Sequence, residues 1–449
     1  MYRSFLIYLA GLANVSSAHS AWLLPAPIVS IGLLLFSQAI YSADLLTLHE
    51  AQQRAIERSR QLGAQDSAAT ASRELAIAAG QLPDPTLRLG IENLPINGPD
   101  AFTIGNDFMT MRRIGVMQEF TRSEKRHLRA ERFEREAEKS LAEKAAIMAS
   151  IQRDTALAWL GRYYAEAMAT VISDQTEQVR REILAAETAY RAGRGSQADL
   201  LAVHGVLIGL EDRSSELNQR IATAKTVLAR WIGEGADAPL GAIPATDSIK
   251  LDTNSLDTDL RHHPQIAVLS KQVEVAAADA RIAQANKKAD WSVELSYSQR
   301  GAPYSNMVSL GVSLPLQWDQ KQRQERELAA KLAMADQAKY ELEEMLRAHV
   351  AEVRAMVQEW QNGRERVARY QREVIPLANE RSRATLTAYQ GGKASVGEVL
   401  LARRNETEIR LQSLQIEMDT ARLWAQLNFF LPDVAGSTHE TSAVPRGAR

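Results

Sequence analysis

The sequence predicts a mainly α-helical fold with a small β-sheet part, and it predicts that this arrangement is built twice along the chain. The 449 residues include only 8 Phe, 7 Trp and 11 Tyr, and they are rich in Ala, Glu, Arg and Gln, a composition that suits long helices. A pattern of residues recurs at a shift of 199 positions (389 − 190). Short segments of alternating apolar and polar residues precede each long helical stretch.

The recurring pattern consists of a tyrosine, a glycine, a serine and an acidic residue, each three positions after the one before. The members are Tyr190, Gly193, Ser196 and Asp199 in the first copy, and Tyr389, Gly392, Ser395 and Glu398 in the second. A repeat of this length cannot be a solenoid unit of a few dozen residues. We therefore expect each copy to be a structural half of the molecule, and both halves to act alike.

The composition excludes several classes of function. The formal net charge is −2 and no block of like charge occurs, so a nucleic-acid surface is not predicted. Cysteine is absent, which rules out disulfides, thiolate metal sites and a cysteine nucleophile. The sequence also contains no nucleophile elbow, no phosphate-binding glycine loop and no metal-ligand cluster. We therefore expect no enzyme, no catalytic residues and no cofactor.

Residues 1–43 have the character of a signal peptide. Arg3 is followed by no charged side chain until Asp44, and the segment contains two apolar runs and several small residues near its end. A membrane anchor is the alternative interpretation. Because Pro25 and Pro27 interrupt the apolar stretch, a span of about 20 helical residues is not available, and an export signal is favoured.

Two stretches predict helices of unusual length. Residues 121–190 contain no proline and only one glycine, Gly161, and their apolar positions mostly recur at steps of three and four. At 1.5 Å per residue such a helix would be about 105 Å long. Residues 321–389 behave alike, with Gly363 and Pro376 as the only helix-weakening residues. Both stretches far exceed the average helix of about 11 residues.

Each long stretch ends at a turn that contains glycines, at 193–195 and 391–392, and a second helix is expected to begin after Ser196 or Ser395. A serine followed by an acid three residues later resembles a capping box, for which Glu398 is the usual residue type and Asp199 is not. Helix capping alone therefore accounts for the presence of Asp199 and Glu398 as well as a role in a functional site would. Each half is expected to contain a long helical hairpin.

Two short alternating segments precede each long helix. Residues 291–298 and 308–316 alternate large apolar side chains with serine, glycine and glutamate, and residues 87–92 and 113–117 do so in the first copy. This alternation is typical of membrane barrel strands. Four strands cannot close a barrel, and an open sheet edge is not viable in lipid. If these strands lie in a membrane, several chains must share one barrel.

Taken together, these features resemble the TolC family of outer-membrane efflux channels, and the resemblance extends from about Leu46 to Pro432. It rests on the export signal, on two repeats of strand pair and helical hairpin, on the Gly-Gln-Leu-Pro-Asp-Pro segment at 80–85, and on the Tyr-x-x-Gly-x-x-Ser-x-x-acid motif at each turn. The resemblance implies a homotrimeric tunnel and barrel, in which the strands form a small membrane β-barrel and the helices cross the periplasm.

The resemblance also implies a division of the chain. After the signal peptide, the first repeat covers residues 44–240, with a helix, a strand pair at 85–120 and a helical hairpin at 121–233. The second repeat covers residues 255–432, with a helix, a strand pair at 290–317 and a hairpin at 318–430. Residues 433–449 are expected to form a flexible C-terminal tail.

In such channels the hairpin turns form the periplasmic tip, where an adaptor protein docks and a ring of acids narrows the entrance. Carried over to this chain, the adaptor-docking candidates are Gly193, Ser196, Leu200, Gly392, Ser395 and Val399, and the gate candidates are Asp199 and Glu398. Glu398 is the better candidate because it has the fuller capping pattern. Three copies of it around an axis would repel one another, which raises the pKa of some of them. The implied partners are a periplasmic adaptor, an inner-membrane pump of the RND type and outer-membrane lipid.

The segment at 112–126 is similar to the CzcC and CusC relatives that serve heavy-metal pumps, so heavy-metal cations are the expected cargo. Organic compounds or antibiotics are the alternative, and a soluble periplasmic coiled-coil scaffold is a more distant one. The strand pattern places methionines on the face that would line the pore, where thioethers could contact Cu(I) or Ag(I); these weak candidates are Met109, Met111, Met117 and Met307. The alternative is that methionine only fills space there.

Overall fold

The computed structural model describes residues 45–193, 195–251 and 256–430. By their contacts, the described residues belong to one compact unit. The expected signal peptide at 1–43 and the expected tail at 433–449 lie outside the described residues.

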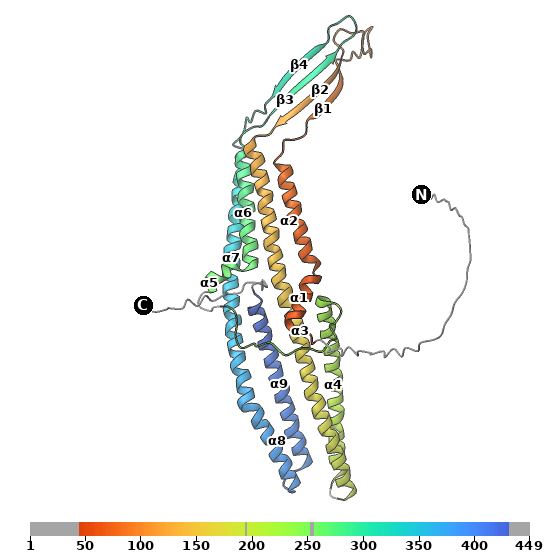
Figure 1. Ribbon diagram of the computed structural model, residues 1–449, viewed down its shortest axis with the longest axis vertical. Coiled ribbons are helices and arrows are strands. Elements are labelled where there is room, and N and C mark those ends of the chain that lie inside the picture. The colour runs from red at the N-terminus through yellow and green to blue at the C-terminus, as the bar shows by residue number, and fades with distance from the viewer. Residues whose placement is uncertain (1–44, 194, 252–255, 431–449) are drawn as a thin grey trace, which may run out of the picture. The chain divides into compact units, whose positions relative to one another are not determined.

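The described unit is mainly helical and contains the same order of elements twice (Figure 1). The first half consists of α1 (Leu48–Arg58), α2 (Arg60–Ala79), β1 (Thr86–Glu92), β2 (Met111–Phe120), α3 (Ser123–Arg191) and α4 (Gln197–Ile232). The second half consists of α5 (Leu256–Asp259), a short 3₁₀ turn (Leu260–His262), α6 (Pro264–Ala285), β3 (Trp291–Gln299), β4 (Met307–Ser313), α7 (Gln324–Arg369), a π turn (Tyr370–Val374), α8 (Ile375–Gln390) and α9 (Val396–Asn428). The predicted fold class, with its duplicated strand pairs and helical hairpins, is confirmed.

The two long helices differ in continuity. Helix α3 runs for 69 residues without a break, as the absence of proline predicts. Its counterpart is divided at the π turn, where the Ile375 N–H donates to the carbonyl of Tyr370, five residues back. Proline has no N–H, and its ring clashes with the carbonyl four residues earlier. The wider turn before Pro376 therefore accommodates the proline, and the helix continues as α8.

The four strands form one antiparallel sheet in the order β1-β2-β3-β4. The central pairing joins the two halves, since Ile114 of β2 lies opposite Tyr297 of β3. Strand β4 ends at Ser313 although the apolar alternation continues to Leu316. Pro315 explains the earlier end, because it cannot donate a ladder hydrogen bond.

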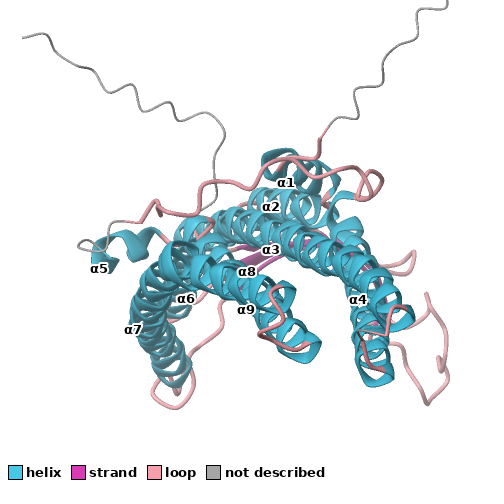
Figure 2. Cartoon of the chain, turned by 90° about the horizontal axis from the view of Figure 1, so that it is seen from below, coloured by secondary structure: helices cyan, strands magenta, loops and turns pink. Residues whose placement is uncertain are grey.

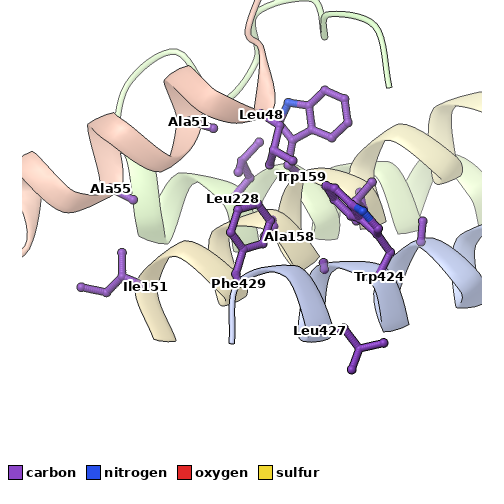
Figure 3. Packing of buried hydrophobic residues seen from close by; sticks show 14 of the residues in the cluster. Leu48, Ala51, Ala55, Ile151, Ala158, Trp159, Leu228, Trp424, Leu427 and Phe429 are labelled. Atoms are coloured by element: carbon purple, nitrogen blue, oxygen red, sulfur yellow. The ribbon is translucent and has the colours of Figure 1, made fainter. Parts of the chain in front are cut away.

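The main hydrophobic core lies where α1, α3, α4 and α9 meet (Figure 3). Trp159 of α3 is 0% exposed and packs with Leu228 of α4 and with Trp424 of α9 in one cluster. Figure 2 views the chain from the end that carries the hairpin turns and shows the helices close to end-on. Within the described part of the chain, no helix has both the length and the apolar character needed to cross a membrane.

Three tryptophan indoles donate hydrogen bonds to backbone carbonyls that lie outside the helices. The indole N–H of Trp159 donates to the carbonyl of Leu46 at 3.0 Å. Leu46 in turn pairs with Leu240 in a parallel bridge. The indoles of Trp360 and Trp424 donate to the carbonyls of Thr246 at 3.2 Å and Ser248 at 2.9 Å. A buried indole N–H requires a partner. For Trp360 and Trp424 the partner is the backbone of the segment that connects the two halves, and for Trp159 it is the residue that pairs with that segment.

An ion pair fixes the junction between the sheet and the helices. Lys125, at the start of α3, is 4% exposed, and its Nζ lies 2.8 Å from Oδ2 of Asp290, the residue before β3. The other oxygen of Asp290 accepts the backbone N–H of Arg122 at 3.0 Å. Beside this pair, the rings of Phe120 and Trp291 stack with centroids 4.6 Å apart. These contacts tie the first half of the chain to the second where the strands leave the helices.

Candidate functional site

The turn of the first helical hairpin (α3–α4) places its glycine and serine as the sequence predicts. Gly193 has φ +70°, a left-handed conformation that favours glycine. Ser196 caps α4, since its Oγ accepts the backbone N–H of Asp199 at 3.1 Å. The carboxylate of Asp199 accepts the backbone N–H of Ser196, also at 3.1 Å. These two reciprocal hydrogen bonds complete a capping box.

The turn of the second helical hairpin (α7–α9) repeats this geometry. Gly392 has φ +72°, the Ser395 Oγ accepts the Glu398 N–H at 3.3 Å, and the Glu398 carboxylate accepts the Ser395 N–H at 2.6 Å. From the sequence, a full capping box is expected only in the second copy. That expectation was wrong for the first copy, because the shorter side chain of Asp199 also reaches the N–H of the capping serine.

The cap sets the charge state of Glu398. The hydrogen bond from the backbone N–H of Ser395, followed by the bond from its hydroxyl, lowers the pKa of the Glu398 carboxyl. A helix N-terminus also favours a negative charge. In the single chain the carboxylate is therefore stabilised in its ionised form, which is opposite in direction to the mutual repulsion expected for three copies around an axis.

Most of the predicted tip residues lie at the surface, at the same end of the chain (Figure 1). Gly193, Ser196, Gly392, Ser395 and Glu398 are exposed, and Leu200 and Asp199 are half-buried. Val399 differs from the others, because it is only 5% exposed. It is thus placed for packing within the chain, and in this conformation its side chain is not presented to a partner.

The two hairpins are joined behind their turns by polar contacts that were not predicted from the sequence. Arg403 of α9 lies 2.5 Å from the Glu182 carboxylate of α3, and it donates to Gln178 at 2.7 Å. Arg213 of α4 lies 2.6 Å from Glu408 of α9. Burial raises the pKa of Glu182, and the charge and hydrogen bond of Arg403 oppose that shift. An apolar cluster of α3, α4 and α9 residues accompanies these bonds; its buried members are Val179, Ile183, Val203 and Leu400.

A groove of about 440 Å³ lies between α3, α4 and α9 on the same stretch of the hairpins. Gly205 and Gly209 line it from α4, and a Cβ atom at either position would meet no atom within 4 Å. Arg403 and Glu408 line it from α9. This groove was not predicted from the sequence, although the Gly-x-x-x-Gly spacing in α4 indicates a surface that another helix can approach closely.

The sheet has one apolar face and one polar face. On the apolar face large side chains are exposed in all four strands, among them Leu87, Leu89, Ile91, Ile114, Val116, Leu295, Tyr297, Val308, Leu310 and Val312. The polar face carries serines, glycines and charged residues, in register across the strands. Monomeric soluble proteins rarely expose a contiguous apolar patch of this kind, which marks an interaction surface.

The strand register places Met111, Met117 and Met307 on the polar face, opposite Glu92, Glu294 and Ser298 in their ladders. Met109 precedes β2 and belongs to the loop between β1 and β2, where its backbone N–H donates to Asp107. The expectation that Met109 shares the strand alternation was therefore wrong. In the ranges 45–193, 195–251 and 256–430, no group of three or more His, Asp or Glu side chains could hold a metal ion.

Solved structures share this arrangement over most of the chain. CusC, whose structures concern the formation of a transmembrane channel, matches with a TM-score of 0.72 over 85% of this chain and 91% of its own, at 15% identity. The outer membrane protein VceC of Vibrio cholerae matches with 0.67 over 85% and 96%, at 19% identity. The MtrE outer membrane channel of Neisseria gonorrhoeae matches with 0.67 over 86% and 88%, at 15% identity.

The chain has the fold of these outer-membrane channels. This confirms the fold expected from the resemblance to the TolC family. Comparisons with family models and with curated proteins give no match. In the channel fold of this chain, the features that bear on function are the apolar face of the sheet at one end, and the two turns and the groove behind them at the other.

Proposed function

We propose that the chain is the outer-membrane channel of a tripartite efflux pump. It passively conducts exported cargo from a periplasmic adaptor and an inner-membrane pump of the RND type to the outside, without catalysis. The observation that carries the proposal is the four-stranded sheet. Its apolar face is exposed, and among the described residues no further strand lies beside its outer strands β1 and β4. Lipid accommodates such a face, but it does not accommodate open edges.

A homotrimer removes the open edges and places the apolar face against lipid. The edge of β1 in one copy pairs with the edge of β4 in the next, so that the sheets close into one barrel with the apolar face toward lipid and the polar face toward the pore. The helices then continue the passage into the periplasm. This assigns the protein to the outer membrane, with its hairpin turns in the periplasm, and agrees with the outer-membrane location of the proteins that share its fold.

The hairpin turns are the proposed docking place of the adaptor. The exposed tip residues Gly193, Ser196, Gly392 and Ser395 support this assignment, and Leu200 contributes its partly exposed side chain. Val399 is left out because it is buried. The groove behind the turns is open and is lined by positively and negatively charged side chains. Such a groove can accept one side of a polar helical hairpin of the adaptor. Asp199 and Glu398 are the proposed gate acids.

Filling the groove is expected to weaken adaptor binding at least tenfold without destabilising the channel. The variants are Gly205→Leu and Gly209→Leu, for which a Cβ meets no atom within 4 Å and for which leucine favours the helix over glycine by about 1 kcal/mol. The measurement is affinity for the cognate adaptor by surface plasmon resonance. Gly63→Leu is the control, since it makes the same change on exposed α2, where a Cβ also meets nothing. Equal affinities for all three variants would show that the groove is not used.

Heavy-metal cations are the proposed cargo. The proposal rests on the similarity of residues 112–126 to the heavy-metal channels, and it is supported by the presence of CusC among the proteins that share the fold. Organic compounds or antibiotics are the second candidate. Deleting the gene is expected to raise sensitivity to copper, silver, cobalt, zinc or cadmium more than sensitivity to dyes and antibiotics. The opposite ranking would favour organic cargo.

The channel itself is tested with the purified full-length protein. A heat-sensitive oligomer extracted from outer membranes, which forms ion-conducting pores in a planar lipid bilayer, is the expected result. A water-soluble monomer without conductance would instead favour a soluble periplasmic coiled-coil scaffold. The long helices alone are also compatible with that function.

A further inference from the structure

The polar face of the sheet carries a small number of charges, and most of them are joined to one another. Three ion pairs connect two arginines and two glutamates on β1, β2 and β3; these residues are Arg88, Glu92, Arg113 and Glu294. The register shows that all four lie on the same face as Ser296 and Ser309. One further charged residue of that face, Glu119, is exposed near the end of β2 that leads into α3.

Arg113 is the central member of this group. Its Nη1 lies 2.5 Å from Oε1 of Glu92, and its Nη2 lies 2.7 Å from Oε1 of Glu294. Arg88 reaches the other oxygen of Glu294 at 3.2 Å. One guanidinium therefore pairs with a carboxylate on each neighbouring strand, and with Arg88 included the four side chains together carry no net charge.

Two glycines lie beside these ion pairs on the polar face. Gly90 lies directly opposite Arg113 in the ladder of β1 and β2. Gly115, also on β2, lies opposite Arg88 of β1 and Ser296 of β3. A Cβ atom at Gly115 would come within 2.9 Å of the Cβ of Ser296. A Cβ atom at Gly90 would meet no atom within 4 Å, so the face beside Arg113 is open there. The ion pairs are made by the reach of the arginine side chains across the strands.

We propose that Arg113 determines the charge selectivity of the barrel part of the pore. The inference rests on the proposed function, in which the polar face lines the pore. Apart from the four paired residues and Glu119, the strands present only threonine, serine, glycine and methionine to that face. With Arg113 in place, Glu119 is the one uncompensated charge that the described strands of each chain present to that face. Without Arg113, each chain adds one uncompensated carboxylate, and a trimer adds three.

The test compares Arg113→Gln with Arg112→Gln in planar bilayers. The two arginines are neighbours on β2, lose the same charge and point to opposite faces, so Arg112→Gln is a matched control. Arg113→Gln is expected to raise the cation-to-anion permeability ratio about threefold at ~0.1 M salt, and less at ~1 M because ions screen the added charge. Arg112→Gln is expected to leave the ratio unchanged.

Two further variants separate charge from structure. Glu92→Gln alone is expected to shift selectivity toward anions, the opposite direction. The double variant Glu92→Gln, Arg113→Gln is expected to return the ratio to that of the unaltered channel, although the ion pair is lost. If the unaltered protein conducts but Arg113→Gln and Arg112→Gln give the same ratio, the inference is wrong while the proposed function stands. If the unaltered protein forms no pore, the proposed function itself fails.

Discussion

Replacing Lys125 with methionine is expected to destabilise the folded chain by about 3 kcal/mol. The methionine fills a similar space, but it leaves Asp290 without the ammonium group that lies 2.8 Å from its carboxylate. An unpaired charge in a site with little access to water is costly, whereas an exposed ion pair contributes little. The measurement is the free energy of unfolding by guanidinium chloride, followed by tryptophan fluorescence; one contributing tryptophan, Trp291, stacks on Phe120 beside the pair.

The second half of the chain offers a matched control. Lys321 lies at the corresponding place before α7, but it is exposed, and Lys321→Met is expected to change stability by less than about 0.5 kcal/mol. The double variant Lys125→Met, Asp290→Asn is expected to recover part of the loss, because it removes the orphaned charge as well. Equal effects of Lys125→Met and Lys321→Met would show that the buried pair does not hold the junction.

The same pair predicts a dependence on pH. Burial raises the pKa of Asp290, but the hydrogen bonds from Lys125 and from the Arg122 N–H, together with nearby positive charges, outweigh burial and leave the pKa below its ordinary value of 3.8. A carboxyl whose pKa is lowered by folding stabilises the folded state at neutral pH and loses that contribution as the pH falls through the lowered pKa. The stability gap between the unaltered chain and Asp290→Asn should therefore be complete at pH 7 and close only below about pH 4.

The parts of the fold that local signals determine could be predicted from the sequence. The length of α3 follows from an uninterrupted helical period, and the faces of the sheet follow from strict alternation. The turns follow from Gly193 and Gly392, because a turn of this kind needs a left-handed residue and both glycines adopt that conformation. Each of these features depends on residues within a few positions of one another, so that one sequence is enough to find them.

Long-range packing could not be predicted in the same way. Lys125 and Asp290 are 165 residues apart, and nothing in either local segment indicates that they meet. The repeat shift pairs Val399 with Leu200, but α9 packs against α3, α7 and α8, whereas α4 packs mainly against α3. The same motif position is therefore buried in one copy and half-buried in the other. The groove between the hairpins likewise depends on how α4 and α9 approach each other.

Replacing Glu398 with alanine is expected to make the closed channel leakier and several-fold less cation-selective. The structure shows that this variant removes two things at once, because the carboxylate is both a negative charge at the tip and a partner of the Ser395 N–H at 2.6 Å. Loss of the charge lowers cation selectivity, and loss of the cap loosens the start of α9. The measurements are closed-state conductance and reversal potential in planar bilayers. Unchanged conductance and selectivity would remove Glu398 from the gate.

Two variants separate the charge from the cap. Glu398→Gln removes the charge but retains an oxygen that can accept the Ser395 N–H, so selectivity should fall while the leak stays small. Ser395→Ala removes the hydroxyl that accepts the Glu398 N–H at 3.3 Å but keeps the charge, so the leak should grow while selectivity is retained. Because the cap lowers the pKa of Glu398 and so opposes the mutual repulsion of three copies, the selectivity of the unaltered channel should persist throughout the neutral range and decline in acid. A leak that follows charge alone, with Ser395→Ala behaving like the unaltered channel, would show that capping has no part in closing the tip.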